Sequence, residues 1–130
     1  ARETARRSTC LRKLVGAVLT RDNRIIAAGY AGSARGRPHC IDSGVGCLIG
    51  PDGGCKRTVH AEINAVLNAA LNGVSTDGAT LYCTLSPCMS CLLMLCNAGI
   101  ERIVYQEKYR IFDEVEKETI AMGIQLEQIT

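Results

Sequence analysis

H-A-E-I-N-A-V-L-N-A-A-L-N, residues 60–72, is followed by A-T-L-Y-C-T, residues 79–84, and then by S-P-C-M-S-C, residues 86–91. The first stretch predicts a helix that Gly73 ends, because its larger apolar residues fall on one helical face: Ile63, Val66, Leu67, Ala70 and Leu71. The second stretch predicts a strand. In the third, Ser86 suits the cap of a second helix and Pro87 its first turn, and this helix is expected to run to about Asn97.

The pattern extends in both directions from this helix–strand–helix unit. Residues 14–20 and 24–30 are expected to form a hairpin around Asp22 and Asn23, which tolerate turn geometry. Residues 1–9 resemble the tail of a helix, and 103–105, 111–122 and 124–129 are expected to form a strand, a helix and a last strand. Strands that alternate with helices indicate one domain over residues 1–130, a three-layer α/β/α fold with a mixed central sheet of about five strands.

Composition excludes several classes of function. The chain has 130 residues, 47% of them hydrophobic, and a net charge of +2, which suits a small anionic substrate better than broad nucleic-acid binding. Aromatic residues make up 4% without any Trp, which disfavours a groove that stacks exposed bases. The longest apolar stretch, residues 91–96, is too short to span a membrane. Of the 8 cysteines, several stand at metal-ligand spacings beside histidines and no export signal is visible, so we expect metal binding rather than a disulfide framework, and a reducing, cytoplasmic location.

Three residues in the stretches 60–62 and 86–91 have side chains that bind zinc. Cys88 and Cys91 are three positions apart at a helix start, so their sulfurs face the same side, where the helix dipole favours thiolates. His60 adds an imidazole, and a catalytic zinc with three protein ligands keeps its fourth position for water. Glu62, two residues from His60, is expected to reach that water and to move its proton.

Each motif alone has other interpretations. A C-x-x-C pair could be a redox pair or a structural zinc knuckle, and a His-x-Glu is common in any helix. A purely structural zinc module would require a closed set of four ligands, which Glu62 beside the ligands argues against. Together, on consecutive helix starts, H-x-E and P-C-x-x-C form the signature of the zinc deaminases.

At these residues the chain resembles the deoxycytidylate deaminases. The matching stretches are residues 8–18, 24–30, 36–40, 57–65, 78–91 and 97–105, and the K-Y-R that ends at Arg110. The resemblance implies hydrolytic deamination of dCMP to dUMP and ammonia, which supplies dUMP for thymidylate synthesis. The alternatives are another cytosine nucleotide, such as a 5-modified dCMP or dCTP, or a base in nucleic acid, as in the adenosine deaminases that act on tRNA. The cysteine-rich loop before His60 favours the nucleotide enzyme.

The resemblance also implies roles for single residues. Glu62 would take a proton from the zinc-bound water and deliver protons to the base. The N–H of Ala61 would meet the base carbonyl, and the main chain around Ser86 would receive the amine. Tyr109 matches a tyrosine that contacts the 5′-phosphate. Arg12 and Arg110 are further phosphate candidates, because a guanidinium fits phosphate oxygens.

One departure concerns regulation. The family usually has Asn after the Gly-Tyr of the second strand, where this chain has Ala31. That asparagine contacts nucleotide in relatives, so its absence weakens the expectation of dCTP and dTTP as effectors. By analogy with the family we expect a homo-oligomer, a hexamer, without nucleic-acid or membrane partners.

A second group of cysteines is expected to hold a structural zinc that pins the loop over residues 32–58. The resemblance implies Cys10 and Cys40 as ligands, and Cys47 and Cys55 stand where the other ligands would come from. The alternatives are a set of reduced thiols, or His39 in place of one cysteine.

Overall fold

The structure, a computed structural model, describes residues 1–10, 13–51 and 53–129. Its centre is a five-stranded sheet with the strand order β2-β1-β5-β6-β7. The strands are β1 (Gly16–Arg21), β2 (Arg24–Tyr30), β5 (Thr80–Leu85), β6 (Arg102–Glu107) and β7 (Gln125–Gln128). Pairing of β1 with β2 and with β5 is antiparallel, whereas β5, β6 and β7 run parallel. The predicted mixed sheet of five strands is therefore confirmed.

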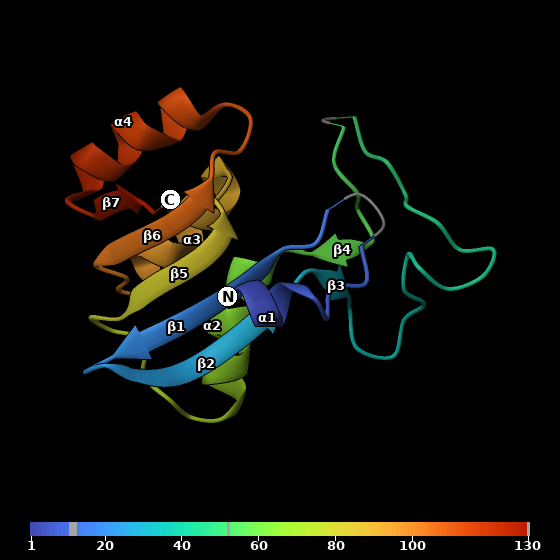
Figure 1. Ribbon diagram of the computed structural model, residues 1–130, viewed down its shortest axis with the longest axis horizontal. Helices are drawn as coiled ribbons and strands as arrows, with labels where there is room; N and C mark the ends of the chain where they lie inside the picture. Colours follow the sequence, from blue (N-terminus) through green and yellow to red (C-terminus); the bar gives the residue numbers. More distant parts are fainter. Residues whose placement is uncertain (11–12, 52, 130) are drawn as a thin grey trace.

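Helices cover the sheet on both faces. Behind the sheet in Figure 1, α2 (Ala61–Leu71) contacts β1, β2 and α3 (Met89–Asn97), and α3 contacts α4 (Phe112–Met122). The short α1 (Arg2–Ala5) lies in front of the sheet and contacts β1 and β2. This arrangement gives the predicted three layers, although the N-terminal helix ends at Ala5 rather than near Thr9.

The predicted buried face of α2 is wrong. The structure buries Ala61, Glu62, Ala65 and Ala69. Leu67 and Leu71, which we expected in the core, are 53% and 66% exposed. The reason is the close approach of α2 to the sheet, which only small side chains allow, so the alanines rather than the leucines of the helix face β2.

Gly29 of β2 makes this approach possible. A Cβ atom at Gly29 would lie 2.3 Å from the Ala65 backbone nitrogen and 2.5 Å from the Ala61 carbonyl oxygen. No side chain tolerates such distances to backbone atoms, so α2 rests directly on the β2 backbone. This contact fixes the start of α2, and with it His60 and Glu62, relative to the sheet.

One edge of the sheet collects the ends of several elements. The carboxyl ends of β5 and β6 and the start of β1 meet there, because β1 runs antiparallel to β5. A two-stranded ribbon, β3 (Gly32–Ser33) and β4 (Thr58–Val59), leads from β2 and into α2. Between these short strands the chain makes the long irregular loop that extends away from the sheet in Figure 1. The predicted functional residues lie on these elements.

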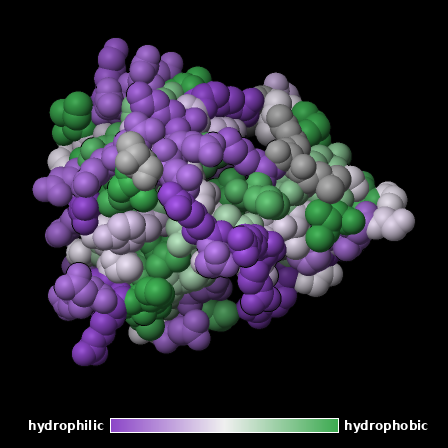
Figure 2. Space-filling model, in the orientation of Figure 1, coloured by the Kyte–Doolittle hydropathy of each residue, from purple (hydrophilic) through white to green (hydrophobic). Residues whose placement is uncertain are grey.

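The hydropathy of the surface does not mark a functional site on the face seen in Figure 2. Figure 2 shows hydrophilic and hydrophobic side chains intermingled over the face seen in the orientation of Figure 1. None of the described helices is long and apolar enough to cross a membrane.

Candidate active site

A cavity of about 220 Å³ opens at this edge of the sheet. Its lining comes from many parts of the chain: the loop before β1, the end of β2, the irregular loop, the starts of α2 and α3, and the segments after β5 and β6. They are Cys10, Lys13, Val15, Ala31, Gly54, Cys55, Thr58, His60, Ala61, Glu62, Leu85, Ser86, Cys88 and Tyr109. Elements far apart in the sequence thus contribute to one site, and both predicted motifs face it.

The tertiary structure brings His60, Cys88 and Cys91 together. The Nδ1 atom of His60 lies 3.2 Å from the Cys91 Sγ and 3.5 Å from the Cys88 Sγ, and the three ligand atoms all lie within 4.8 Å of one another. Ligand atoms around a tetrahedral zinc with usual bond lengths lie about 3.5 to 3.8 Å apart. The donor set and its spacing therefore fit a zinc ion held by three protein ligands.

Two helix starts position these ligands. His60 and Cys88 are the N-cap residues of α2 and α3, and both have an extended backbone. The predicted cap of the second helix is therefore wrong: Ser86 and Pro87 precede the helix, and the side chain of Ser86 is used elsewhere. The positive ends of both helix dipoles point at the ligand group, which favours anionic sulfur there.

The Cys88 thiol ionises readily. A hydrogen bond from the Cys91 thiol, helped by the neighbouring His60, lowers the pKa of Cys88 to about 4. The pKa of Cys91 is raised, because its thiol donates to Cys88 and is buried. A bound divalent cation favours the thiolate form of a coordinating cysteine. The site therefore presents one thiolate readily and a second when a metal binds.

Glu62 lies in the same cavity and is 4% exposed. Burial raises the pKa of its carboxyl group above the usual value, because water is missing around the charged form. A carboxyl group whose pKa moves toward neutral pH can both accept and donate a proton. Glu62 thus has the position and the protonation behaviour of a proton carrier beside the metal ligands.

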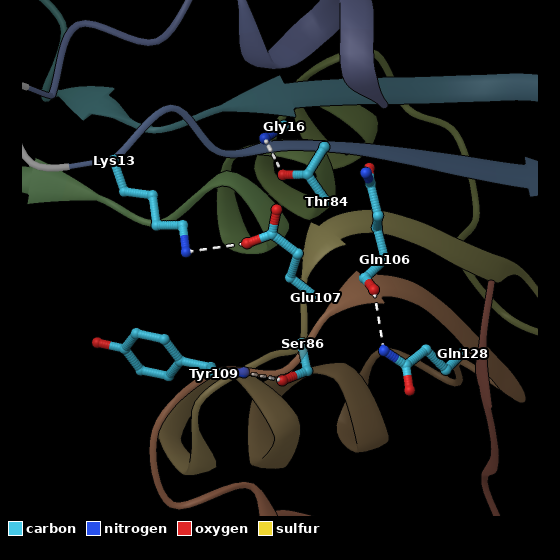
Figure 3. A network of polar contacts seen from close by, with 8 residues as sticks. All are labelled: Lys13, Gly16, Thr84, Ser86, Gln106, Glu107, Tyr109 and Gln128. Carbon is cyan, nitrogen blue, oxygen red and sulfur yellow. Dashed lines mark hydrogen bonds and ion pairs between the residues drawn. The ribbon is translucent and has the colours of Figure 1, made fainter. Parts of the chain in front are cut away.

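Ser86 positions the segment that carries Tyr109. Its Oγ accepts a hydrogen bond of 2.7 Å from the Tyr109 N–H (Figure 3). Its own N–H donates to the Glu107 carbonyl at 2.9 Å. Ser86 is buried, so these bonds are shielded from water. They hold the start of the β6–α4 connection against the end of β5, and Tyr109 lines the cavity as a result.

The other predicted substrate contacts have different outcomes. Ala61 lines the cavity at the first position of α2, where a backbone N–H has no partner within the helix. Arg110 is not among the cavity-lining residues; its guanidinium lies 5.4 Å from the centre of the Tyr109 ring. Arg12 lies outside the described residues. Ala31 is buried and lines the cavity, and its carbonyl accepts hydrogen bonds from the Ser8 hydroxyl and the Thr9 N–H.

Sequence reasoning missed Lys13, which lines the cavity and forms an ion pair with Glu107. In the sequence Lys13 stands directly before an apolar run, where a lysine normally marks only a solvated strand end. No local pattern could have shown that the chain carries it across the end of β5 toward β6.

A second group of possible ligands consists of Cys40, Cys47 and Cys55, whose sulfurs all lie within 4.8 Å of one another. The sulfurs of Cys40 and Cys55 are 3.7 Å apart, a distance that fits two thiolates on one zinc. Cys10 is buried and lines the cavity together with Cys55, but it is not part of this three-residue group. The Nδ1 atom of His39 is hydrogen-bonded to the Thr9 hydroxyl at 2.9 Å, and His39 does not belong to the group either.

Local backbone bonds bring these loop cysteines together. Ile49 and Cys55 form an isolated antiparallel bridge, and the Lys56 N–H donates to the Leu48 carbonyl at 2.7 Å. Cys47 and Cys55 therefore stand on the two arms of a small turn. Although burial opposes ionisation, hydrogen bonds from the Thr58 hydroxyl and from backbone groups lower the pKa of Cys55 to about 6. This thiol is thus prepared for metal binding.

Comparison with known proteins agrees with this geometry. The sequence model of one protein family, the "Cytidine and deoxycytidylate deaminase zinc-binding region", matches residues 1–107 of this chain. These residues include both motifs and both cysteine groups. The chain belongs to this family. A zinc-binding deaminase domain accounts for the group formed by His60, Cys88 and Cys91.

Individual relatives support the same assignment. The chain is 44% identical over 125 residues to the ComE operon protein 2 of Bacillus subtilis, a match that covers 96% of this chain and 65% of the relative. It is 36% identical over 129 residues to the deoxycytidylate deaminase of Schizosaccharomyces pombe, covering 95% of this chain and 40% of the relative. The chain thus spans less than two thirds of the length of these curated relatives.

A solved structure matches over nearly the whole length. The dCMP deaminase of the cyanophage S-TIM5, in complex with dCMP and dUMP, superposes with a TM-score of 0.83 and 32% identity, covering 99% of this chain and 90% of that one. The observed sheet and the helices that cover it are therefore those of a deaminase of this family.

Proposed function

We propose that this chain catalyses the zinc-dependent hydrolysis of dCMP to dUMP and ammonia. The observation that carries the proposal is the His60–Cys88–Cys91 ligand group together with the buried carboxyl group of Glu62, which lines the same cavity as His60 and Cys88. Similarity to the cyanophage enzyme that binds dCMP and dUMP supports this choice of nucleotide.

Glu62 would carry protons during this reaction. When bound, zinc makes hydroxide available at neutral pH by polarising water. The Glu62 carboxylate takes a proton from the attacking water and passes it to N3 of the cytosine as the oxygen adds to C4. The Glu62 carboxylate then takes the remaining proton from the hydroxyl group on C4 and delivers it to the exocyclic amino group, the C4–N bond breaks and ammonia leaves. One water is consumed and one ammonia is released, so atoms and charge balance.

Groups around the cavity would orient the substrate. The Ala61 N–H at the start of α2 is available to the base carbonyl. The backbone around Ser86 would receive the amino group, and Tyr109, held by Ser86, would face the phosphate end. Arg110 stacks on Tyr109 and would add positive charge nearby.

Purified protein loaded with zinc should release ammonia from dCMP, with a kcat/KM well above that for deoxycytidine, dCTP, 5-methyl-dCMP and a cytosine- or adenosine-containing oligonucleotide. Coupled detection of ammonia gives the rates, and chromatography of the products identifies dUMP. Higher turnover of any other substrate in this panel would reassign the substrate. Turnover of the oligonucleotide would favour a nucleic-acid deaminase, which the aromatic content of 4% argues against.

We further propose that the enzyme acts as a homo-oligomer, a hexamer by family analogy, in a reducing compartment such as the cytoplasm. Because Ala31 stands where an asparagine would contact nucleotide, activation by dCTP and inhibition by dTTP through this position are not expected.

We also propose a second, structural zinc held by Cys40, Cys47 and Cys55, with Cys10 as the fourth ligand. Three sulfurs of this set lie within metal-binding distance of one another, and Cys10 is buried in the cavity wall beside Cys55. Four thiolates would close the site to water and fix the irregular loop against the segment before β1.

Replacing Cys47 with Ser should lower the zinc content from about two to about one ion per chain, because a closed thiolate site rarely tolerates the loss of a ligand. Atomic absorption measures the metal, and hydrogen exchange of residues 40–56 should become faster. Cys96→Ser is the matched control, since Cys96 lies in α3 outside both ligand groups. A zinc content of one ion per chain in the wild type would exclude the second metal.

A further inference from the structure

Lys13 brings positive charge to a cavity that otherwise has little. Among the described residues that line the cavity, Lys13 is the only lysine or arginine. The same cavity holds Glu62, whose carboxyl group is negative when it is ready to take a proton, and the thiol of Cys88. A dianionic substrate entering this cavity requires a compensating cation.

The amino group of Lys13 is held at the cavity wall by a carboxylate. Its Nζ lies 3.2 Å from an Oε of Glu107, and both side chains are about half exposed. Such an exposed ion pair contributes little free energy, so the Lys13 amino group can leave Glu107 for a partner that binds it more strongly. A phosphate monoester carries a charge of roughly −1.5 to −2 at neutral pH and offers three strong acceptor oxygens.

Glu107 also fixes where this amino group stands relative to the site. The backbone carbonyl of Glu107 accepts from the Ser86 N–H, and Ser86 in turn holds the Tyr109 backbone. Figure 3 shows the Lys13 side chain reaching toward Glu107, close to the Ser86–Tyr109 pair. Lys13, Ser86 and Tyr109 therefore form one wall of the cavity, joined through Glu107.

We propose that Lys13 binds the 5′-phosphate of the substrate and thereby selects nucleotides over nucleosides. This role rests on the proposed deamination of dCMP. Without nucleotide, the Lys13 amino group pairs with Glu107. When the phosphate enters beside Tyr109, the amino group transfers to the phosphate oxygens, and Glu107 remains at the solvent-exposed rim. The base end of the cavity, at Glu62 and the zinc ligands, does not require Lys13.

Steady-state kinetics with dCMP and deoxycytidine test this role. Lys13→Gln should lower kcat/KM for dCMP by about tenfold to a hundredfold, the effect expected for the loss of a charge-assisted hydrogen bond, mostly through KM. The same variant should leave kcat/KM for deoxycytidine nearly unchanged. Lys13→Arg should restore most of the preference for dCMP, because it restores the cation.

Lys117→Gln is the matched control, since it removes the same charge from the exposed surface of α4. It should leave the rates with both substrates unchanged. The role of Lys13 is refuted if Lys13→Gln keeps the wild-type ratio of dCMP to deoxycytidine rates, or lowers both rates equally. If the wild-type protein turns over deoxycytidine but not dCMP, the proposed function is wrong, and the phosphate role of Lys13 is refuted with it.

Discussion

Replacing Glu62 with Gln is expected to lower kcat for dCMP by roughly a hundredfold to ten-thousandfold, with zinc still bound, because general acid–base catalysis contributes a factor of about that range. Gln has nearly the same shape but can neither accept a proton from water nor deliver one to the base. Glu62 is buried in the cavity that the zinc ligands share, so no bulk water can replace it directly. Rates of ammonia release and zinc content per chain are the two measurements.

The metal measurement separates a chemical role from a structural one. Glu62 is not part of the group formed by His60, Cys88 and Cys91, so the variant should bind as much zinc as the wild type. Glu118→Gln on the exposed surface of α4 controls for the loss of one carboxylate. Activity of Glu62→Gln within tenfold of the wild type would mean that another group carries the proton.

Replacing Cys91 with Ser is expected to remove the catalytic zinc and to reduce activity to the background of the assay. A neutral hydroxyl is a poor zinc ligand, and the two remaining ligands would leave the ion weakly held. Without the metal, the pKa of water stays far above neutral pH, so hydroxide at neutral pH is lost. Cys91 is buried in the first turn of α3, next to the His60 imidazole.

Cys83→Ser and Cys96→Ser make useful comparisons, because these cysteines pack in or against the core and belong to neither ligand group. Zinc content and thermal unfolding should be measured on all three variants. The expected pattern is loss of about one zinc ion from Cys91→Ser alone. Full zinc content and activity in Cys91→Ser would show that the metal is held elsewhere.

Local chemistry explains why the metal ligands could be predicted. His60, Cys88 and Cys91 are of types that bind zinc, and the spacing of the two cysteines at a helix start makes their sulfurs neighbours in any fold that forms this helix. Alternation of strands and helices likewise predicted the layered architecture. The boundaries of α2, β2 and α4 agree with the sequence-based ranges to within a residue or so.

Long-range packing explains the two clear errors. The leucines of α2 were expected in the core because they fall on one helical face with the other apolar residues, but Gly29 brings α2 so close to β2 that only alanines fit between them. Ser86 was expected to cap α3 because of its local position. Its hydroxyl instead accepts from the Tyr109 N–H, a partner 23 residues away that no local pattern reveals.

The sequence by itself determined the zinc ligands, the acidic residue beside them and the α/β layers, since these depend on residue type and on spacings within single helices and strands. Only the tertiary structure decided which face of α2 is buried, that Lys13 lines the same cavity as Glu62, and that Cys40, Cys47 and Cys55 form a group without Cys10. The physical reason is that these contacts join segments that are distant in the chain. They form only where the order and direction of the strands bring β1, β5 and β6 to one edge of the sheet.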